Sequence, residues 1–323
     1  MNTSGTRPAS VTVSAPGKIN VSLQVGPLRP DGYHAVASVY LALDLREDVT
    51  AAAAPRPGIT VCVEGGGPLQ IPVDGIPLGP DNLVARAAAA LAAHAGIADP
   101  AVELTITKRV PVAGGMGGGS ADAAAALLAC NLLWGTGLDA AELRALAAGL
   151  GADVPFALAG GAAVGLGVGD LLTEVPAETP LHWVLVASSG SGLSTPAVYG
   201  RLDALRAEAE AVGAAAAPEP DAADPRVLEA LRTGNAAALA GVITNDLQPA
   251  ALSLAPELEQ VLQRGRALGA LAGIVSGSGP TLAFLAADAG SAARLEAALR
   301  SEGHNALAVH GPVAGAQPTA SKT

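Results

Sequence analysis

Polar and apolar residues alternate with period two in three segments of the first third of the chain, at residues 11–14, 59–64 and 102–108. This alternation is typical of strands that bury one face and expose the other to water. Strands that are buried on both faces, as in doubly wound parallel sheets, have unbroken apolar runs instead. We therefore expect an antiparallel or mixed sheet in the first half of the chain.

Helix start and stop signals accompany these strands. One helix is expected to begin after Asn82, another at Ser120 and a third at Asp139. Asp139 and Glu142 have the spacing of a capping box, in which each side chain binds the backbone N–H of the other residue. The glycines at 149–151 supply the stop signal of the third helix.

The second half of the chain mixes strands and helices as well. The expected elements are a strand at 183–187, helices over 227–240 and 256–268, a strand pair at 274–275 and 282–285, a helix over 291–303 and a strand at 306–310. This order predicts an α+β fold in each half. A chain of 323 residues also exceeds the size at which one core usually stops growing, so we expect two domains.

The expected domain boundary lies at residue 170. It gives an N-terminal domain over residues 11–170 and a C-terminal domain over residues 171–310. The termini, 1–10 and 311–323, are expected to be disordered, and the run rich in Ala, Glu and Pro at 207–225 is expected to be a mobile surface insert.

Charge and hydropathy narrow the classes of partner. The net charge is −11, whereas nucleic acids and anionic membranes attract proteins with spread-out basic charge, so we expect neither as a partner. A small anionic ligand that is held by local donors is compatible with this charge. The longest uncharged apolar stretch, residues 267–287, contains Ser-Gly-Ser-Gly-Pro in its middle. Because that segment would leave backbone groups unpaired in lipid, we expect strand, loop and strand there.

The cysteines and the N-terminal sequence predict the compartment. Cys62 and Cys130 have no CxxC spacing and no nearby histidine, which favours buried thiols in a reducing compartment and excludes a structural zinc site. The N-terminal sequence lacks the apolar segment of a signal peptide. We therefore expect a cytoplasmic protein.

A glycine-rich loop is the strongest local signal. Five of the six residues from Gly114 to Gly119 are glycine, and a helix is expected directly afterwards. Free backbone N–H groups and a helix N-terminus favour a di- or triphosphate; a flexible turn or a ligand-free strand-to-helix joint is the alternative. No lysine precedes Ser120, which excludes a Walker A loop, and no acidic residue at a strand end follows at the Rossmann distance.

Three further segments are candidates for chemistry. Lys18, one of only three lysines in the chain, follows a Pro-Gly pair at the expected end of a strand; a solvated surface charge is the alternative. Asp153 precedes Val-Pro-Phe in a segment of low charge, which suggests a partly buried base, or else a helix cap or turn residue. The loop at 276–281 joins two apolar strands and contains more glycine than a hairpin needs, so it is expected to approach a ligand.

In this order the segments resemble the GHMP kinase superfamily. Its three motifs match Pro16–Asn20, Gly115–Ser120 and Ser276–Thr281. Further segments resemble those members that act on an alcohol linked to cytidine diphosphate; they lie at 31–34, 81–83, 151–155, 167–170 and 245–246. The set covers most of residues 11–310.

The resemblance implies a two-domain GHMP kinase fold of the α+β class. Its N-terminal ATP-binding domain would contain a left-handed βαβ unit, and its C-terminal domain would be ferredoxin-like. The implied reaction is ATP-dependent phosphorylation of the 2-hydroxyl of a cytidine-diphosphate-linked methylerythritol, a step of isoprenoid precursor biosynthesis. The alternatives are a GHMP kinase that acts on mevalonate or homoserine, and a nucleotide-binding regulatory protein that has lost catalysis.

The resemblance also implies roles for residues on the substrate side. Asp153 would take the proton of the 2-hydroxyl, and Lys18 would keep Asp153 ionised and steady the transferring charge. The residues implied in substrate binding are Asn20 at the methylerythritol hydroxyls, Tyr33 and Tyr199 on the two faces of the cytosine, His34 at its edge, and Gly277, Ser278 and Gly279.

The remaining implied roles concern ATP. The ATP-binding residues would be Asn82, Leu83 and Lys108 around the adenine, and Pro111, Val112, Ala113, Gly114, Gly115, Met116, Gly117, Gly118, Gly119, Ser120 and Ala121 at the phosphates. Mg²⁺ would accompany the nucleotide, with Ser120 as a candidate contact and no dedicated cluster of acidic ligands. Both substrates are small molecules, and the chain is expected to be a monomer or a weak homodimer.

Overall fold

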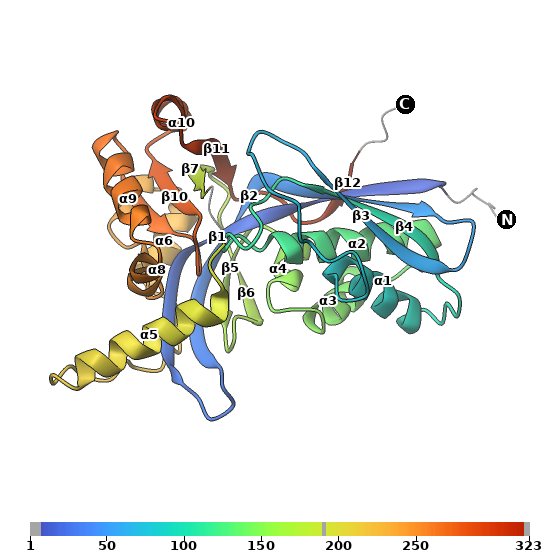
Figure 1. Ribbon diagram of the computed structural model, residues 1–323, viewed down its shortest axis with the longest axis horizontal. Helices are drawn as coiled ribbons and strands as arrows, with labels where there is room; N and C mark the ends of the chain where they lie inside the picture. The colour runs from blue at the N-terminus through green and yellow to red at the C-terminus, as the bar shows by residue number, and fades with distance from the viewer. Residues whose placement is uncertain (1–7, 189–191, 320–323) are drawn as a thin grey trace.

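The computed structural model describes residues 8–188 and 192–319 of the chain, which form two β-sheets with helices packed against them (Figure 1). In the larger sheet the order is β12 (Gln317–Pro318), β1 (Ser10–Leu28), β2 (His34–Ala53), β4 (Ala101–Lys108) and β3 (Gly58–Gly65), with β5 (Ala162–Leu166) on β2, β6 (Leu171–Val175) on β5 and β8 (Thr244–Asn245) on β1. In the smaller sheet the order is β11 (Asn305–Gly311), β7 (Leu181–Ala187), β10 (Leu282–Ala286) and β9 (Ala272–Val275).

The period-two segments form strands of the larger, mixed sheet, as predicted. In β4 the residues Val102, Leu104 and Ile106 are buried while the residues between them are more exposed. The predicted strand at 11–14 is too short for β1, and the sequence analysis missed β2. These two strands form one long antiparallel hairpin from Ser10 opposite Ala52 to Leu28 opposite His34. Register shifts interrupt this hairpin, and they allow a strand to continue where its sequence pattern breaks.

Helices cover one face of the larger sheet. They are α1 (Leu83–His94), α2 (Gly118–Trp134), α3 (Ala140–Ala148) and α4 (Val154–Ala159). The strands β3 and β4 are parallel and joined through α1, which forms a βαβ unit; its left-handed sense stays a prediction. The sequence of α2 is rich in alanine and buried on almost every side, because small side chains let the sheet and the neighbouring helices approach closely. The capping box between Asp139 and Glu142 is present at the start of α3.

The smaller sheet has the ferredoxin-like arrangement that the resemblance implied. Its strands are antiparallel, β7 and β9 lie on either side of β10, and β10 and β11 lie on either side of β7. Its outer face is covered by α5 (Thr195–Glu210), α8 (Gln248–Leu254), α9 (Glu257–Ala267) and α10 (Ala289–Ser301). Its other face packs with α6 (Pro225–Thr233) and α7 (Ala236–Ala240).

The two sheets share one hydrophobic core. Ile19 and Leu41 of the larger sheet lie in the same buried cluster as Trp183 and Leu285 of the smaller sheet. The cluster lies under the middle of β1 and β2, so these strands connect the two halves of the molecule. Among the described residues, no helix is both long enough and apolar enough to cross a membrane.

The sheets divide the chain at a later point than residue 170. The strand β6, at Leu171–Val175, pairs with β5 and belongs to the larger sheet, and the smaller sheet begins with β7 at Leu181. The short strands β8 and β12 also return to the larger sheet, on β1. A single boundary along the chain cannot separate the two sheets, because strands that follow residue 170 pair with strands that precede it.

The C-terminal segment differs from the expected disorder over residues 311–319. It runs along α4 and ends in β12, with backbone hydrogen bonds at Val313, Ala316 and Thr319. Residues 320–323 lie outside the described residues, as do residues 1–7, while Ser10 already belongs to β1. The expected disorder was inferred from composition, and composition does not register hydrogen bonds that are made by the backbone.

Two smaller expectations also need revision. The first four residues of the expected insert at 207–225 belong to α5, and a Cβ on Gly26 would lie 3.0 Å from Cδ of Pro220, so this segment touches the hairpin. The mobility of the rest stays a prediction. Cys130 is buried as expected, but Cys62 is exposed, because it lies on the solvent side of the edge strand β3.

Candidate active site

The glycine-rich loop between β4 and α2 is held by contacts from two other parts of the chain. Lys18 on β1 donates its backbone N–H to the carbonyl of Met116 (3.0 Å), and Ser276 donates its hydroxyl to the carbonyl of Gly115 (3.1 Å). A Cβ on Gly115 would lie 1.9 Å from the carbonyl oxygen of Ser276, and its φ of +76° favours glycine as well. The loop at 276–281 therefore braces the glycine-rich loop.

The helix α2 begins inside this loop. Its first residue is Gly118, two positions before the predicted start, and Gly117 precedes it with a φ of +68°. The unpaired N–H groups of the first turn and the positive end of the helix dipole therefore lie at the end of the loop. This is the arrangement in which a helix N-terminus binds phosphate.

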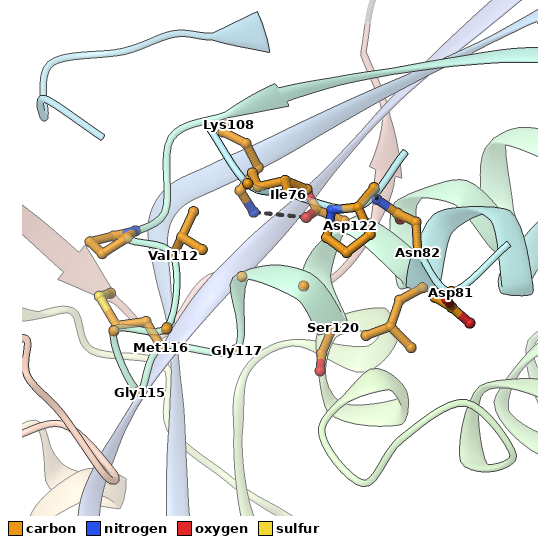
Figure 2. Close-up of a pocket in the computed structure, with 18 of the residues that line it drawn as sticks. Ile76, Asp81, Asn82, Lys108, Val112, Gly115, Met116, Gly117, Ser120 and Asp122 are labelled. Carbon is orange, nitrogen blue, oxygen red and sulfur yellow. Dashed lines mark hydrogen bonds and ion pairs between the residues drawn. The ribbon is translucent and has the colours of Figure 1, made fainter. Parts of the chain in front are cut away.

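A pocket of about 480 Å³ lies along the loop (Figure 2). The predicted residues in its wall are Asn82, Leu83, Lys108 and every residue from Pro111 to Ser120. Ala121, which was also predicted, does not line the pocket, because its side chain is buried in the core on the inner side of α2. Residues 74–77 form a further part of the wall, which sequence reasoning missed.

Asn82 joins two parts of the pocket wall through its amide oxygen and its amide nitrogen. Its Oδ1 accepts a hydrogen bond from the backbone N–H of Val84 (2.8 Å) and so caps α1. Its Nδ2 donates to the carbonyl of Pro77 (2.6 Å). Asn82 therefore ties the missed segment to α1. The signal that could have located this segment is the Asp74–Gly75 pair, a turn sequence shortly before the helix.

Lys108 lies in the wall of the pocket with its ammonium group bound to two buried carboxylates. Its Nζ lies 2.5 Å from Oε1 of Glu47 and 2.7 Å from Oδ2 of Asp122. Glu47 has no exposed surface and also accepts the backbone N–H groups of Arg109 and Val110. The expectation that Lys108 lies near the nucleotide is compatible with this position, but sequence reasoning missed both of its partners.

Burial controls the protonation of this cluster. Desolvation, and then the charge of Asp122, raises the pKa of Glu47 to about 7 in spite of Lys108. Desolvation also raises the pKa of Asp122. For Lys108, desolvation opposes the charged form, but the two carboxylates outweigh it and raise its pKa, so the ammonium stays charged.

Lys18 and Asp153 come together on the other side of the loop. Nζ of Lys18 lies 3.6 Å from Oδ2 of Asp153 and donates a hydrogen bond to Oδ1 of Asn20 (2.8 Å). Asn20 in turn donates to the hydroxyl of Ser38 (2.6 Å). A Cβ on Gly117 would lie within 3.3 Å of the Lys18 side chain and 3.6 Å from Oδ2 of Asp153, so this ion pair lies directly beside the glycine-rich loop.

The position of Lys18 corrects the prediction that it follows a strand end. It lies inside β1, because a register shift between Pro16 and Lys18 absorbs the Pro-Gly pair without ending the strand. Residues two apart on a strand share one face, which brings Lys18 and Asn20 together. Lys18 is only 8% exposed, so it is not a solvated surface charge.

Asp153 stands at the N-cap position of α4, the alternative that the sequence left open. Within the described structure, however, its side chain accepts no capping hydrogen bond from that helix. The carboxylate is turned toward Lys18, and 28% of the side chain is exposed. A carboxylate that is partly open, paired with an ammonium and free of a capping role is suited to accept a proton from a ligand.

A second pocket, of about 300 Å³, contains this ion pair. The predicted residues in its wall are Lys18, Asn20, Asp153, Tyr199, Gly277 and Ser278, together with Gly115 and Ser120 of the loop. Gly115 and Ser120 also line the first pocket, so the two pockets meet at the glycine-rich loop. Sequence reasoning missed further wall residues, which are Leu23, Val36, Tyr40, Ala152, Val168, Thr195 and Leu247.

The predicted aromatic residues are brought together only in part. The rings of His34 and Tyr199 lie 5.1 Å apart, and Tyr199 lines the second pocket. Nδ1 of His34 lies 3.0 Å from the carbonyl of Gly26, and its Nε2 lies 3.4 Å from Asp203. Tyr33 is 63% exposed in the turn between β1 and β2 and does not line the pocket. Gly279 is likewise outside the pocket wall.

Tyr40 is the missed residue with the clearest place in the site. Its ring centroid lies 5.5 Å from Nζ of Lys18, a cation–π distance, and its hydroxyl donates to the carbonyl of Gly169 (3.5 Å). Burial, and then the Asp153 charge, raises the pKa of Tyr40, and the same causes raise the pKa of Tyr199 to about 12. Both phenols are therefore neutral at ordinary pH.

The residues present fit a magnesium ion that is bound mainly by phosphate oxygens. Mg²⁺ prefers oxygen ligands and commonly takes one or two carboxylates in addition to substrate phosphates. Ser120 and Asp153 offer such oxygens in the second pocket. Among the described residues, no group of three or more His, Cys, Asp or Glu side chains could hold a metal ion without a substrate.

Comparison with known proteins identifies the family. The GHMP kinases N terminal domain matches residues 82–161, and the GHMP kinases C terminal domain matches residues 227–305. A 4-diphosphocytidyl-2-C-methyl-D-erythritol kinase from Pseudarthrobacter chlorophenolicus is 57% identical over 319 residues, which cover 98% of each chain. The enzyme of the same name from Streptomyces coelicolor is 54% identical, over 91% of this chain and 93% of its own.

Solved structures support the same assignment. A crystal structure of 4-(cytidine 5'-diphospho)-2C-methyl-D-erythritol kinase matches with a TM-score of 0.72 and 32% identity, over 93% of this chain and 98% of that one. The mevalonate kinase of L. major matches with a TM-score of 0.69 at 16% identity, over 94% of this chain and 96% of its own, which shows a shared fold. The chain therefore belongs to the GHMP kinase superfamily and, within it, to the family of 4-diphosphocytidyl-2-C-methyl-D-erythritol kinases.

Proposed function

We propose that this chain transfers the γ-phosphoryl group of ATP to the 2-hydroxyl of 4-diphosphocytidyl-2-C-methyl-D-erythritol. The observation that carries the proposal is the meeting of two pockets at Gly115 and Ser120, with Lys18 and Asp153 on one side of that junction. A kinase needs a nucleotide and an acceptor on either side of the transferring group. The identity of 57% to a family member over nearly the whole chain supports the choice of acceptor.

The first pocket is assigned to ATP. Its glycine-rich wall and the N-terminus of α2 offer backbone N–H groups to the phosphates, which compensates for the acidic character of the chain. The base would lie toward Asn82, Leu83 and residues 74–77. Magnesium would neutralise phosphate charge when bound with the nucleotide, and Ser120 is the residue that would contact it.

Asp153 is assigned as the base and Lys18 as its partner. Phosphoryl transfer depends on positioning and on neutralising charge more than on covalent chemistry by the protein. Nζ of Lys18 lies 3.6 Å from this carboxylate, which is proposed to take the proton of the acceptor hydroxyl. Asn20 and Tyr40 hold the ammonium group of Lys18 from two other directions.

The second pocket is assigned to the acceptor alcohol. Asn20, Gly277 and Ser278 line it and are proposed to contact the methylerythritol portion. The neutral ring of Tyr199, packed beside His34, is proposed as one face of the cytosine site. Tyr33 would complete the stack only by moving in from its exposed turn. The expected monomer or weak homodimer and the cytoplasmic location also stay predictions.

An ADP-release assay with three alcohols tests the proposed function. Turnover of the cytidylyl compound, with little turnover of mevalonate or homoserine, is the expected result. Preferred turnover of mevalonate or homoserine would overturn the acceptor assignment, and no turnover of any of the three would favour a regulatory protein. Asp153→Asn tests the mechanism, with an expected loss of about 10²- to 10⁴-fold in kcat and little change in the KM of ATP. Undiminished turnover would remove Asp153 from the role of base.

A further inference from the structure

The helix that carries Asp153 is too short to hold its position alone. The helix α4 contains six residues, and isolated helices of this length are unstable in water. Asp153 itself makes no capping contact in the described structure that would fix its side chain to α4. The distance between Asp153 and Lys18 therefore depends on what holds α4 in place.

The C-terminal segment 312–318, which we call the strap, holds the far end of α4. Ala316 donates its backbone N–H to the carbonyls of Ala157 and Leu158 (3.0 and 3.2 Å), and Gly161 donates to the carbonyl of Val313 (2.8 Å). A Cβ on Gly315 would lie 2.0 Å from the carbonyl oxygen of Leu158. The strap thus touches the last turn of α4 backbone to backbone, which leaves no room for a side chain.

Arg46 fastens the strap to the strand that carries Lys18. Its guanidinium donates to the carbonyls of Ala314 (2.8 Å) and Gly315 (2.6 Å) in the strap. The same group donates to the carbonyl (2.9 Å) and the hydroxyl (3.0 Å) of Ser14, four residues before Lys18 on β1. A planar guanidinium can serve several acceptors at once in a fixed geometry, which a lysine ammonium cannot do.

We propose that Arg46 and the strap are a positioning device that sets the distance between Asp153 and Lys18. The connection runs from Lys18 along β1 to Ser14, through Arg46 to the strap, and through α4 to Asp153. This inference rests on the proposed role of Asp153 as the base. Arg46 touches neither pocket wall, so it acts on the reaction only through the residues it holds.

We expect Arg46→Ala to lower kcat while leaving the KM values nearly unchanged. A shift of about 1 Å in a reacting group lowers the rate by about 100-fold, so we expect kcat to fall by about 10- to 100-fold. The KM values of ATP and of the acceptor should stay within about twofold, because the pocket walls remain. Millimolar guanidinium should restore part of kcat by occupying the vacated site. Arg226→Ala, which removes an exposed arginine paired with Asp224, should leave all three constants unchanged.

A second variant keeps the test decisive if Arg46→Ala does not fold. Gly315→Ala pushes the strap away from Leu158 while Arg46 stays in place, and it should also lower kcat without raising KM. Its control is Gly241→Ala, since a Cβ there would meet its nearest neighbour at an ordinary 3.6 Å. A cooperative thermal transition verifies that each variant is folded before its kinetics are compared.

The kinetics of these variants distinguish a failure of the positioning role from a failure of the proposed function. Full kcat in folded Arg46→Ala and Gly315→Ala, together with an inactive Asp153→Asn, would overturn the positioning role alone. A proportional rise of both KM values would also overturn it, because the pockets rather than the base would then be disturbed. An active Asp153→Asn would instead overturn the assignment of the base, and the positioning role with it.

Discussion

The buried cluster of Glu47, Lys108 and Asp122 predicts an unusual dependence of stability on pH. Glu47 is fully buried, receives one ammonium and two backbone N–H groups, and has a pKa of about 7. The perturbation that tests this is Glu47→Gln, which keeps the shape of the side chain and removes its titration. The substitution also exchanges one acceptor oxygen for an NH₂ group, and the resulting loss of hydrogen bonds does not depend on pH.

The sign and size of the effect follow from the shift in pKa. An ordinary glutamate loses its proton near 4.5, whereas folded Glu47 keeps it up to about 7. Between these values the folded protein binds more protons than the unfolded chain, so its free energy of unfolding falls as the pH rises. This contribution is fully present below pH 4.5 and is lost as the pH passes 7. The shift corresponds to about 3 kcal/mol.

Urea-induced unfolding at a series of pH values measures this contribution. Between about pH 5 and pH 8 the free energy of unfolding of the wild-type chain should fall by about 3 kcal/mol more than that of Glu47→Gln. Glu103→Gln, which changes an exposed carboxylate on β4, should follow the wild-type profile. If the free energy of unfolding falls equally with pH in the wild-type chain and in Glu47→Gln, the assigned pKa of Glu47 is refuted. A constant difference in stability between the two proteins would not change this conclusion.

Three further variants test the site and its support. Tyr33→Ala should raise the KM of the acceptor but not that of ATP, with little change in stability because the side chain is exposed; equal rises would argue against the cytosine role. Gly115→Ala should weaken ATP binding in a calorimetric titration, while Gly137→Ala, with a similar positive φ but no neighbour within 4 Å among the described residues, should bind normally. Lys108→Met should lower the free energy of unfolding by about 3–5 kcal/mol, since two buried carboxylates lose their counter-ion. A loss below 1 kcal/mol in chemical denaturation would show that these carboxylates are neutral without it.

The sequence predicted those elements whose causes lie within a few neighbouring residues. The alternation at 102–108 marked β4, because one face of that strand is buried and the other is not. The pair of Asp139 and Glu142 marked the start of α3, because a capping box is complete within four residues. The glycine-rich loop was recognisable because a backbone that approaches phosphate requires glycine whatever the rest of the fold.

Other parts of the site depend on contacts between distant segments and left no such signal. Glu47 and Lys108 are 61 positions apart, and neither sequence neighbourhood reveals that they form an ion pair. The composition of the strap is typical of disordered segments, yet backbone hydrogen bonds and the distant Arg46 hold it in place. Lys18 was placed at a strand end because a Pro-Gly pair usually interrupts a strand, whereas here a register shift accommodates it.

The edge of β1 has a consequence for the synthesis of the chain. Two short strands cover that edge, β8 at Thr244–Asn245 and β12 at Gln317–Pro318, and both are translated long after β1 itself. While the ribosome is still adding residues, β1 presents an uncovered edge that other nascent chains can pair with, so early chaperone cover would protect it. The strap likewise follows β1, β2 and α4 in the chain, so it is made after all three. If the strap positions α4 as proposed, the arrangement of Lys18 and Asp153 is completed only after residue 318 has been made.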